Sequence, residues 1–135
     1  MRLEIEQREA QGTFVLHLTG RLVLGEEDLA LRQRLTSLLD SGRIKVIVDL
    51  KEVSDIDSAA LGTLVLYAGR FTEAGGKLVL LHLKVSQADL PDMLKLNAAF
   101  ETYDDEAAAV NSFFPERAVN HYDILEFVEE QERRR

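Results

Sequence analysis

A mixed α/β domain is the fold that this sequence predicts, and two regions carry the prediction. The first 19 residues contain two stretches of alternating apolar and polar side chains separated by a turn, which is typical of a β-hairpin. Further on, residues 44–50, 58–74 and 77–83 have the pattern of a strand, an amphipathic helix and another strand. We therefore expect a mixed β-sheet, an N-terminal hairpin plus parallel strands, covered by about four helices and followed by a C-terminal helical extension.

The hairpin is predicted by its alternation. Leu3, Ile5 and Gln7 alternate with charged residues, as in a strand with one face in water. Gln11-Gly12 supplies the turn, and residues 13–19 form the second strand. Because the connection is so short, the two strands should pair with each other.

A helix should follow Gly25. Its first turn carries Glu26, Glu27 and Asp28, where the partial positive charge of a helix N-terminus favours acids. Gly42 is the expected stop. The apolar positions that we expect to form one buried stripe are Leu29, Leu31, Leu35, Leu38 and Leu39.

The centre of the chain reads as a strand, a helix and a second strand. Residues 44–50 are apolar and β-branched enough for a strand that is covered on both faces. The helix that starts at Ser58 runs to about Ala74 and is ended by Gly75-Gly76, after which residues 77–83 form the next strand. A run of this length implies a parallel pair with a right-handed crossover.

The rest of the domain is predicted more coarsely. Ser86 should cap a third helix that reaches Leu96, residues 100–103 should form a short edge strand, and residues 104–113 a fourth helix. These elements complete one domain over residues 1–114.

Residues 115–135 form a separate C-terminal extension, because Pro115 interrupts the pattern. Glu129 with Arg133, and Glu130 with Arg134, have the spacing of helical ion pairs, so we expect a helix. This helix either packs on its own domain or frays in solvent, or it forms a homodimer contact.

Composition excludes several classes of function. The chain has 135 residues, no cysteine and a formal net charge of -8. That charge argues against nucleic-acid binding, which depends on clusters of Lys and Arg, and it suits a protein partner with a basic patch. No apolar run is long enough to span a bilayer and no signal-peptide core is present, so we expect a cytoplasmic protein without membrane insertion.

We find no catalytic constellation in the sequence. The histidines, His17, His82 and His121, are isolated, and no metalloprotease or nucleotide-binding motif is present. Glu52, Asp55 and Asp57 are the one arguable metal cluster, but a hard cation needs about six oxygens and this segment offers few. We therefore predict that the protein is not an enzyme and binds no metal or cofactor.

One hydroxyl stands out, at the predicted mouth of the central helix. Asp57 or Ser58 is a good helix N-cap, since a side-chain oxygen accepts a bond from a free amide of the first turn. Capping is the ordinary role of such residues. The wider pattern around Ser58 suggests a second role.

The segment resembles the signature of the STAS domain, a fold shared by bacterial anti-sigma-factor antagonists and the tails of sulphate transporters. The family pattern is a strand that ends in Asp-Leu, a short loop, and then Asp-Ser-Ser/Thr-Gly-x-Gly at the start of a helix. Asp49-Leu50 match the strand end, Asp57 and Ser58 match the first two signature positions, and Leu61 and Gly62 match the last two. The resemblance extends to about Phe114.

This resemblance implies an anti-sigma-factor antagonist. Such a protein binds an anti-sigma factor that is also a serine kinase of the histidine-kinase-like ATPase type, and so releases a sigma factor. In regulated antagonists the serine that follows the aspartate is phosphorylated, and that position is Ser58. Family members often carry an acid after the second strand, where this chain has Val23, and the signature's second hydroxyl and glycine are Ala59 and Ala60.

These departures favour an alternative, in which the domain is a non-phosphorylated scaffold or assembly module in a signalling complex or beside a lipid-transport ATPase. In either case we expect the partner to meet a loop at 52–57 and the exposed side of the helix, where we place Thr63, Tyr67 and Arg70. The predicted partner-binding set is Asp55, Asp57, Ser58, Ala59, Leu61, Gly62 and Thr63.

Overall fold

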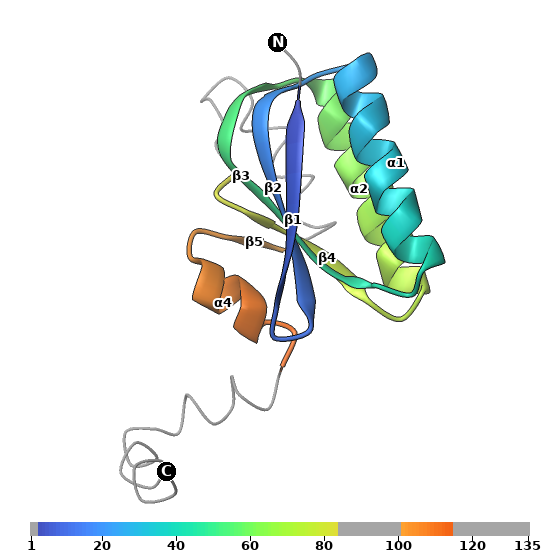
Figure 1. The fold of residues 1–135 in the computed structure, drawn as a ribbon, viewed down its shortest axis with the longest axis vertical. Helices are drawn as coiled ribbons and strands as arrows, with labels where there is room; N and C mark the ends of the chain where they lie inside the picture. The colour runs from blue at the N-terminus through green and yellow to red at the C-terminus, as the bar shows by residue number, and fades with distance from the viewer. Residues whose placement is uncertain (1–2, 84–100, 115–135) are drawn as a thin grey trace, which may run out of the picture.

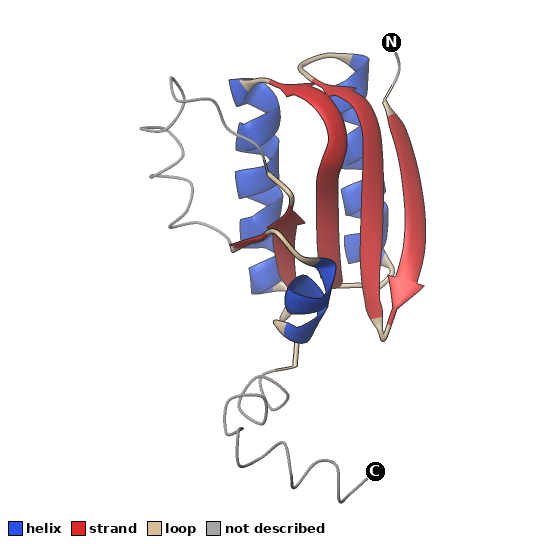
Figure 2. Cartoon of the chain, turned by 90° about the vertical axis from the view of Figure 1, so that its left-hand side faces the viewer, coloured by secondary structure: helices blue, strands red, loops and turns tan. Residues whose placement is uncertain are grey.

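A computed structural model describes residues 3–83 and 101–114 of the chain. Its five strands form one sheet in the order β1-β2-β3-β4-β5. The strands are β1 (Glu4–Ala10), β2 (Thr13–Leu22), β3 (Lys45–Ile56), β4 (Lys77–Leu81) and β5 (Thr102–Tyr103). The helices in the described part are α1 (Glu26–Asp40), α2 (Ser58–Glu73) and α4 (Glu106–Asn111). Helices α1 and α2 lie side by side on one face of the sheet, and α4 lies against the other (Figures 1 and 2).

The predicted hairpin is confirmed. Strands β1 and β2 pair antiparallel from Glu4↔Thr19 to Ala10↔Thr13, without a register shift. Gln11 and Gly12 both have positive φ, 56° and 85°, which is the conformation of a type I′ turn. This turn matches the twist of the two strands and fixes their register.

The parallel arrangement is also confirmed, because β3 pairs parallel with both β2 and β4. The predicted end of β3 was wrong. We expected a loop at 52–57, but the strand continues to Ile56, since residues 19–22 at the end of β2 pair with residues 52–56. Irregularities in the β2–β3 register, between His17 and Thr19 and between Gly20 and Arg21, allow this pairing to continue.

The main core lies between the sheet and the two long helices. Alternate residues of β3, Val46, Val48 and Leu50, point to this side. They meet the fully buried Leu35 of α1 and Leu64 of α2. The core confirms the predicted inward positions Leu31, Leu35 and Leu38 of α1, with Leu39 partly buried at its edge.

The predicted buried stripe was wrong at Leu29, because the side chain of Leu29 is 53% exposed. It lies two residues, or about 200° around the helix, from the buried Leu31. Asp28 is the residue of the first turn that points inward.

A smaller apolar cluster lies on the other face of the sheet. In this cluster, the strand residues that alternate with those of the main core pack against Ala109 and Val110 of α4. The strand residues are Val15, Ile47, Val79 and Leu81. Helix α4 is shorter than the predicted 104–113, and β5 is shorter than the predicted 100–103.

The turn between α2 and β4 requires glycine at position 76. A Cβ atom built on Gly76 would lie 2.0 Å from the carbonyl oxygen of Ile44, which is far inside van der Waals contact. This close approach lets the Lys77 amide donate to the same carbonyl, at 2.8 Å, where β4 begins beside β3.

Several predictions lie outside the described residues: the third helix at 86–96, the extension at 115–135 and its dimer contact. The described part therefore holds three helices where about four were expected for the whole chain. None of the helices in residues 3–83 and 101–114 is both long and apolar enough to cross a membrane.

Candidate functional site

Asp57 organises the N-terminal end of α2 and the adjoining loop at Leu24, which together we call the mouth of α2. Asp57 is the N-cap of the helix, in an extended conformation, and its Oδ1 accepts a bond from the Ala60 amide at 2.9 Å. Its Oδ2 accepts a second bond from the Leu24 amide at 3.0 Å. One carboxylate therefore joins the first turn of α2 to the loop between β2 and α1.

These bonds also affect the acidity of the group. The bond from the Leu24 amide lowers the pKa of Asp57 below its usual value, burial opposes this, and the bond from the Ala60 amide lowers it further. Asp57 is therefore a carboxylate at neutral pH. Its charge is favourable at this position, beside the positive end of the helix dipole.

Ser58 is the first residue of α2, and its side chain is exposed. Ala59 is partly buried, and Ala60 is completely buried under the helix. The sequence left open whether Asp57 or Ser58 caps the helix; since Asp57 does so, the Ser58 hydroxyl is not required as the cap.

Two residues expected on the exposed side of α2 are buried instead. Thr63 is only 1% exposed, and Tyr67 is buried with its hydroxyl 2.9 Å from Thr36 Oγ1 of α1. Both face α1 rather than solvent, so the predicted exposure of Thr63 and Tyr67 was wrong. Arg70 is exposed as expected, with its guanidinium 4.9 Å from the centre of the Tyr67 ring.

Thr63 belongs to a polar contact that links α2 to α1. Its Oγ1 donates to Asp28 Oδ1 at 2.7 Å, and Arg32 donates both to Asp28 Oδ2 and to Thr63 Oγ1, at 2.9 Å each. The Asp28 amide in turn donates to the Val23 carbonyl at 3.1 Å. The segment around Val23 is therefore held by α1.

Exposed leucines lie on the elements that form the mouth, and the sequence analysis did not identify them. Leu24, next to the Asp57 carboxylate, is 69% exposed, and Leu66 of α2 is 43% exposed. Gly62 and Gly69 share the exposed face of α2 with Leu66. The available signal was the helical period, because positions 62, 66 and 69 fall on one face.

Charged side chains flank the same end of the sheet. Asp55 and Arg21 are both exposed and form an ion pair at 3.4 Å between β3 and β2. Leu61 is partly buried. The predicted set is thus divided: Asp55, Ser58 and Gly62 face solvent, Asp57, Ala59 and Leu61 are partly covered, and Thr63 is inside.

A second polar cluster lies on the opposite face of the sheet. His17 of β2 donates from Nδ1 to Asp49 Oδ2, and His82, after β4, donates from Nδ1 to Asp49 Oδ1, both at 3.0 Å. The Lys51 amide donates to Asp49 Oδ1 at 3.0 Å as well. His82 has a positive φ of 60°, and its amide donates to the Tyr103 carbonyl at 2.8 Å.

Asp49 remains ionised despite its position. Burial alone would raise its pKa, but the bonds from His82, the Lys51 amide and His17 together lower it below the usual value. Across residues 3–83 and 101–114, no group of three or more His, Asp or Glu side chains is arranged to hold a metal ion. We interpret this cluster as a satisfied buried charge.

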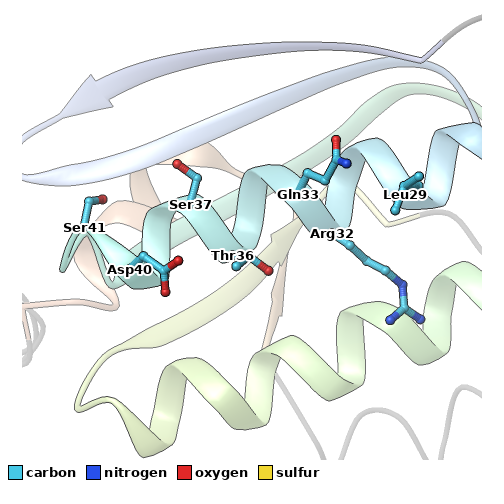
Figure 3. A pocket seen from close by; sticks show the side chains of 7 residues that line it. All are labelled: Leu29, Arg32, Gln33, Thr36, Ser37, Asp40 and Ser41. Atoms are coloured by element: carbon cyan, nitrogen blue, oxygen red, sulfur yellow. The ribbon is translucent and has the colours of Figure 1, made fainter.

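A hollow of the described surface follows helix α1. It is an open groove of about 690 Å³ along the outer side of α1 (Figure 3). Its lining residues are Leu29, Arg32, Gln33, Thr36, Ser37, Asp40 and Ser41. The groove is lined by α1 and the residue that follows it, and none of the predicted partner-binding residues lines it.

Comparison with known proteins identifies the family. The STAS domain family matches residues 4–109 of this chain. None of the curated protein sequences matches the chain at a significant level.

Solved structures with the same fold include a protein from Thermotoga maritima assigned as an anti-sigma factor antagonist. Its TM-score is 0.72 and its sequence identity is 19%, and the match covers 81% of this chain and 93% of that one. An anti-sigma factor antagonist from Mycobacterium paratuberculosis has a TM-score of 0.68 and 15% identity over 82% and 93% of the two chains. SpoIIAA of Bacillus in its phosphorylated form has a TM-score of 0.63 and 16% identity over 81% and 98%.

Proposed function

Because this chain belongs to the STAS domain family, we propose that it is an anti-sigma-factor antagonist that is switched by phosphorylation of Ser58. In this proposal the unmodified protein binds an anti-sigma factor with serine kinase activity in the cytoplasm and thereby releases a sigma factor. The protein acts by binding and carries out no catalysis of its own.

The observation that carries the proposal is the position of Ser58. Its hydroxyl is exposed at the first residue of α2, while Asp57 takes over the capping of the helix. A kinase can therefore reach the hydroxyl without unfolding the helix. The added phosphate carries about -1.5 to -2 charges, and amides at a helix N-terminus tolerate an anion at that point.

The proposed switch is local. Exposed Leu24 and Leu66 supply apolar contact area on the elements of the mouth, and Asp55 supplies an acid beside it. A partner that packs closely against these residues covers Ser58 and leaves no space for a phosphate. Phosphorylation then releases the partner by steric conflict, with little change in the fold.

Incubation with the cognate kinase and ATP, followed by mass spectrometry, tests the modification. We expect one phosphate on Ser58, none in Ser58→Ala, and an unchanged yield in Ser54→Ala, which removes a nearby hydroxyl that is bonded to the Gly20 carbonyl. Failure to modify Ser58 would remove the switch and leave only the binding.

The alternative function is a scaffold that never becomes phosphorylated, and the departures from the family signature favour it. Ala59 and Ala60 replace the second hydroxyl and the glycine, and Val23 replaces the acid after the second strand. Ser58→Glu separates the two functions. In a pull-down from native lysate, an antagonist loses its partner on this substitution, whereas a scaffold keeps its complex.

A further inference from the structure

The outer edge of β1 has a charge pattern that complements itself. This strand is first in the sheet order, so within the described residues only β2 pairs with it. Such an edge offers unpaired amides and carbonyls to another strand. We propose that a second copy of this chain pairs antiparallel along β1, about a two-fold axis that passes through Gln7.

The turn determines which backbone groups face outward. Gln11 and Gly12 form a two-residue type I′ turn, so Ala10 and Thr13 are its hydrogen-bonded closing pair. In an antiparallel ladder the bonding direction alternates along the strand. Because the β1–β2 register has no shift, the even-numbered residues bond toward β2, and Ile5, Gln7 and Glu9 direct their amides and carbonyls outward.

This alternation limits the possible registers of a self-pair. Outward-bonding residues must oppose each other, so the two-fold axis has to pass through a residue. An axis at Glu6 or Glu9 brings two glutamates together, an axis at Arg8 brings two arginines together, and an axis at Ile5 places Glu4 against Glu6. Like charges that face each other directly are destabilising. These four registers are therefore disfavoured.

An axis at Gln7 gives a complementary register. Each Glu6 then lies opposite Arg8 of the second copy, twice in a symmetric interface. Outward-bonding Ile5 and Glu9 lie opposite each other, so all three outward residues of both strands make ladder bonds. The Glu6–Arg8 pair falls at a non-hydrogen-bonded site, where Cα atoms approach to about 4.5 Å and side chains are closest.

A groove beside β1 extends the same interface. It is a hollow of about 350 Å³ between β1 and α1, and its lining combines the partly buried Leu3, Ile5 and Ala30 with the polar Gln33, Arg34 and Ser37. Since the two-fold axis is perpendicular to the sheet, both copies carry α1 on the same side. The α1 helix of the second copy thus faces this groove, and the occupant we assign to it is that helix.

Sedimentation of the full chain tests this pairing with charge variants. Arg8 also bonds Glu106 of α4, so the series is built on Glu106→Gln, which removes that ion pair and should itself stay dimeric. We expect the wild type to sediment at twice the mass of one chain. Glu6→Arg and Arg8→Glu should each be monomeric, and the double charge swap should be dimeric again.

Mixing provides the sharpest comparison. A Glu6→Arg copy presents arginine at both positions and an Arg8→Glu copy presents glutamate at both, so the two monomeric variants should form a heterodimer when combined. Circular dichroism verifies that each variant is folded; if a single variant is not, the double swap and Glu106→Gln decide. A monomeric wild type, single variants that still dimerise, or a mixture that stays monomeric would overturn the proposal.

Discussion

Different interactions stabilise the two faces of the sheet. On the α1–α2 side, β3 contributes Val46, Val48 and Leu50 to a continuous apolar core. On the α4 side, the intervening positions are Ile47, which is apolar, and Asp49, a carboxylate that is only 5% exposed. Packing therefore stabilises one face, whereas the other also depends on hydrogen bonds that satisfy a charge.

The largest effect should come from the apolar face. Leu64→Ala removes a completely buried side chain of α2 and should lower the free energy of unfolding by about 2–5 kcal/mol. Leu66→Ala, two residues further along the same helix, removes a side chain that is 43% exposed and should change this free energy much less, by about 0.5 kcal/mol. Urea denaturation measures both, and equal losses would contradict the assigned faces of α2.

Thr63→Val should have a smaller effect, because it keeps the shape and removes only the hydroxyl that bonds Asp28. We expect a loss of about 1–3 kcal/mol, since a buried carboxylate oxygen loses a donor. Thr72→Val is the matched control, because both threonines donate to the carbonyl four residues earlier, but Thr72 is exposed. If both variants unfold at the same urea concentration, the contact between α1 and α2 adds no stability.

The polar face should show its contribution through pH. Asp49 has a pKa below its usual value in the folded state, so its contribution is complete above the ordinary Asp pKa of about 4 and is lost as pH falls further. Asp49→Asn should cost about 1–2 kcal/mol at pH 7 and should flatten the fall in stability below about pH 4. Denaturation from pH 7 to pH 2 measures this.

Two outcomes of that series are informative. Asp55→Asn, at an exposed position of the same strand, should lose stability at acid pH as steeply as the wild type does. If the stability of Asp49→Asn falls at acid pH as steeply as that of the wild type, the His17–Asp49–His82 cluster does not stabilise the folded state through its charge.

The smallest effect should come from the surface ion pair between Arg8 and Glu106, which joins β1 to α4. Both side chains are substantially exposed, so Glu106→Gln should cost less than about 1 kcal/mol, and high salt should abolish the difference. A larger loss that persists in salt would mean that α4 depends on this contact more than on Ala109 and Val110.

The sequence predicted those features that depend on local pattern. The hairpin was readable from alternation and from Gln11-Gly12, and the β3–α2–β4 unit from apolar runs separated by one amphipathic stretch. Ser58 was placed correctly at the start of the helix, because capping is a property of a few neighbouring residues.

The errors and omissions depend on contacts between distant segments. Thr63 and Tyr67 have polar groups, so pattern alone assigned them to solvent, but α1 provides the buried Asp28 as a partner for Thr63 and the Thr36 hydroxyl as a partner for Tyr67. The His17–Asp49–His82 cluster requires the register of three parallel strands, including their irregularities, and a single sequence does not specify that register.

The two bonds accepted by Asp57 have a consequence for recognition. Because one carboxylate holds the start of α2 and the loop at Leu24, these two segments are fixed relative to each other before any partner arrives. Association then costs little ordering entropy, and the rate of complex formation should depend on diffusion and charge rather than on a slow rearrangement.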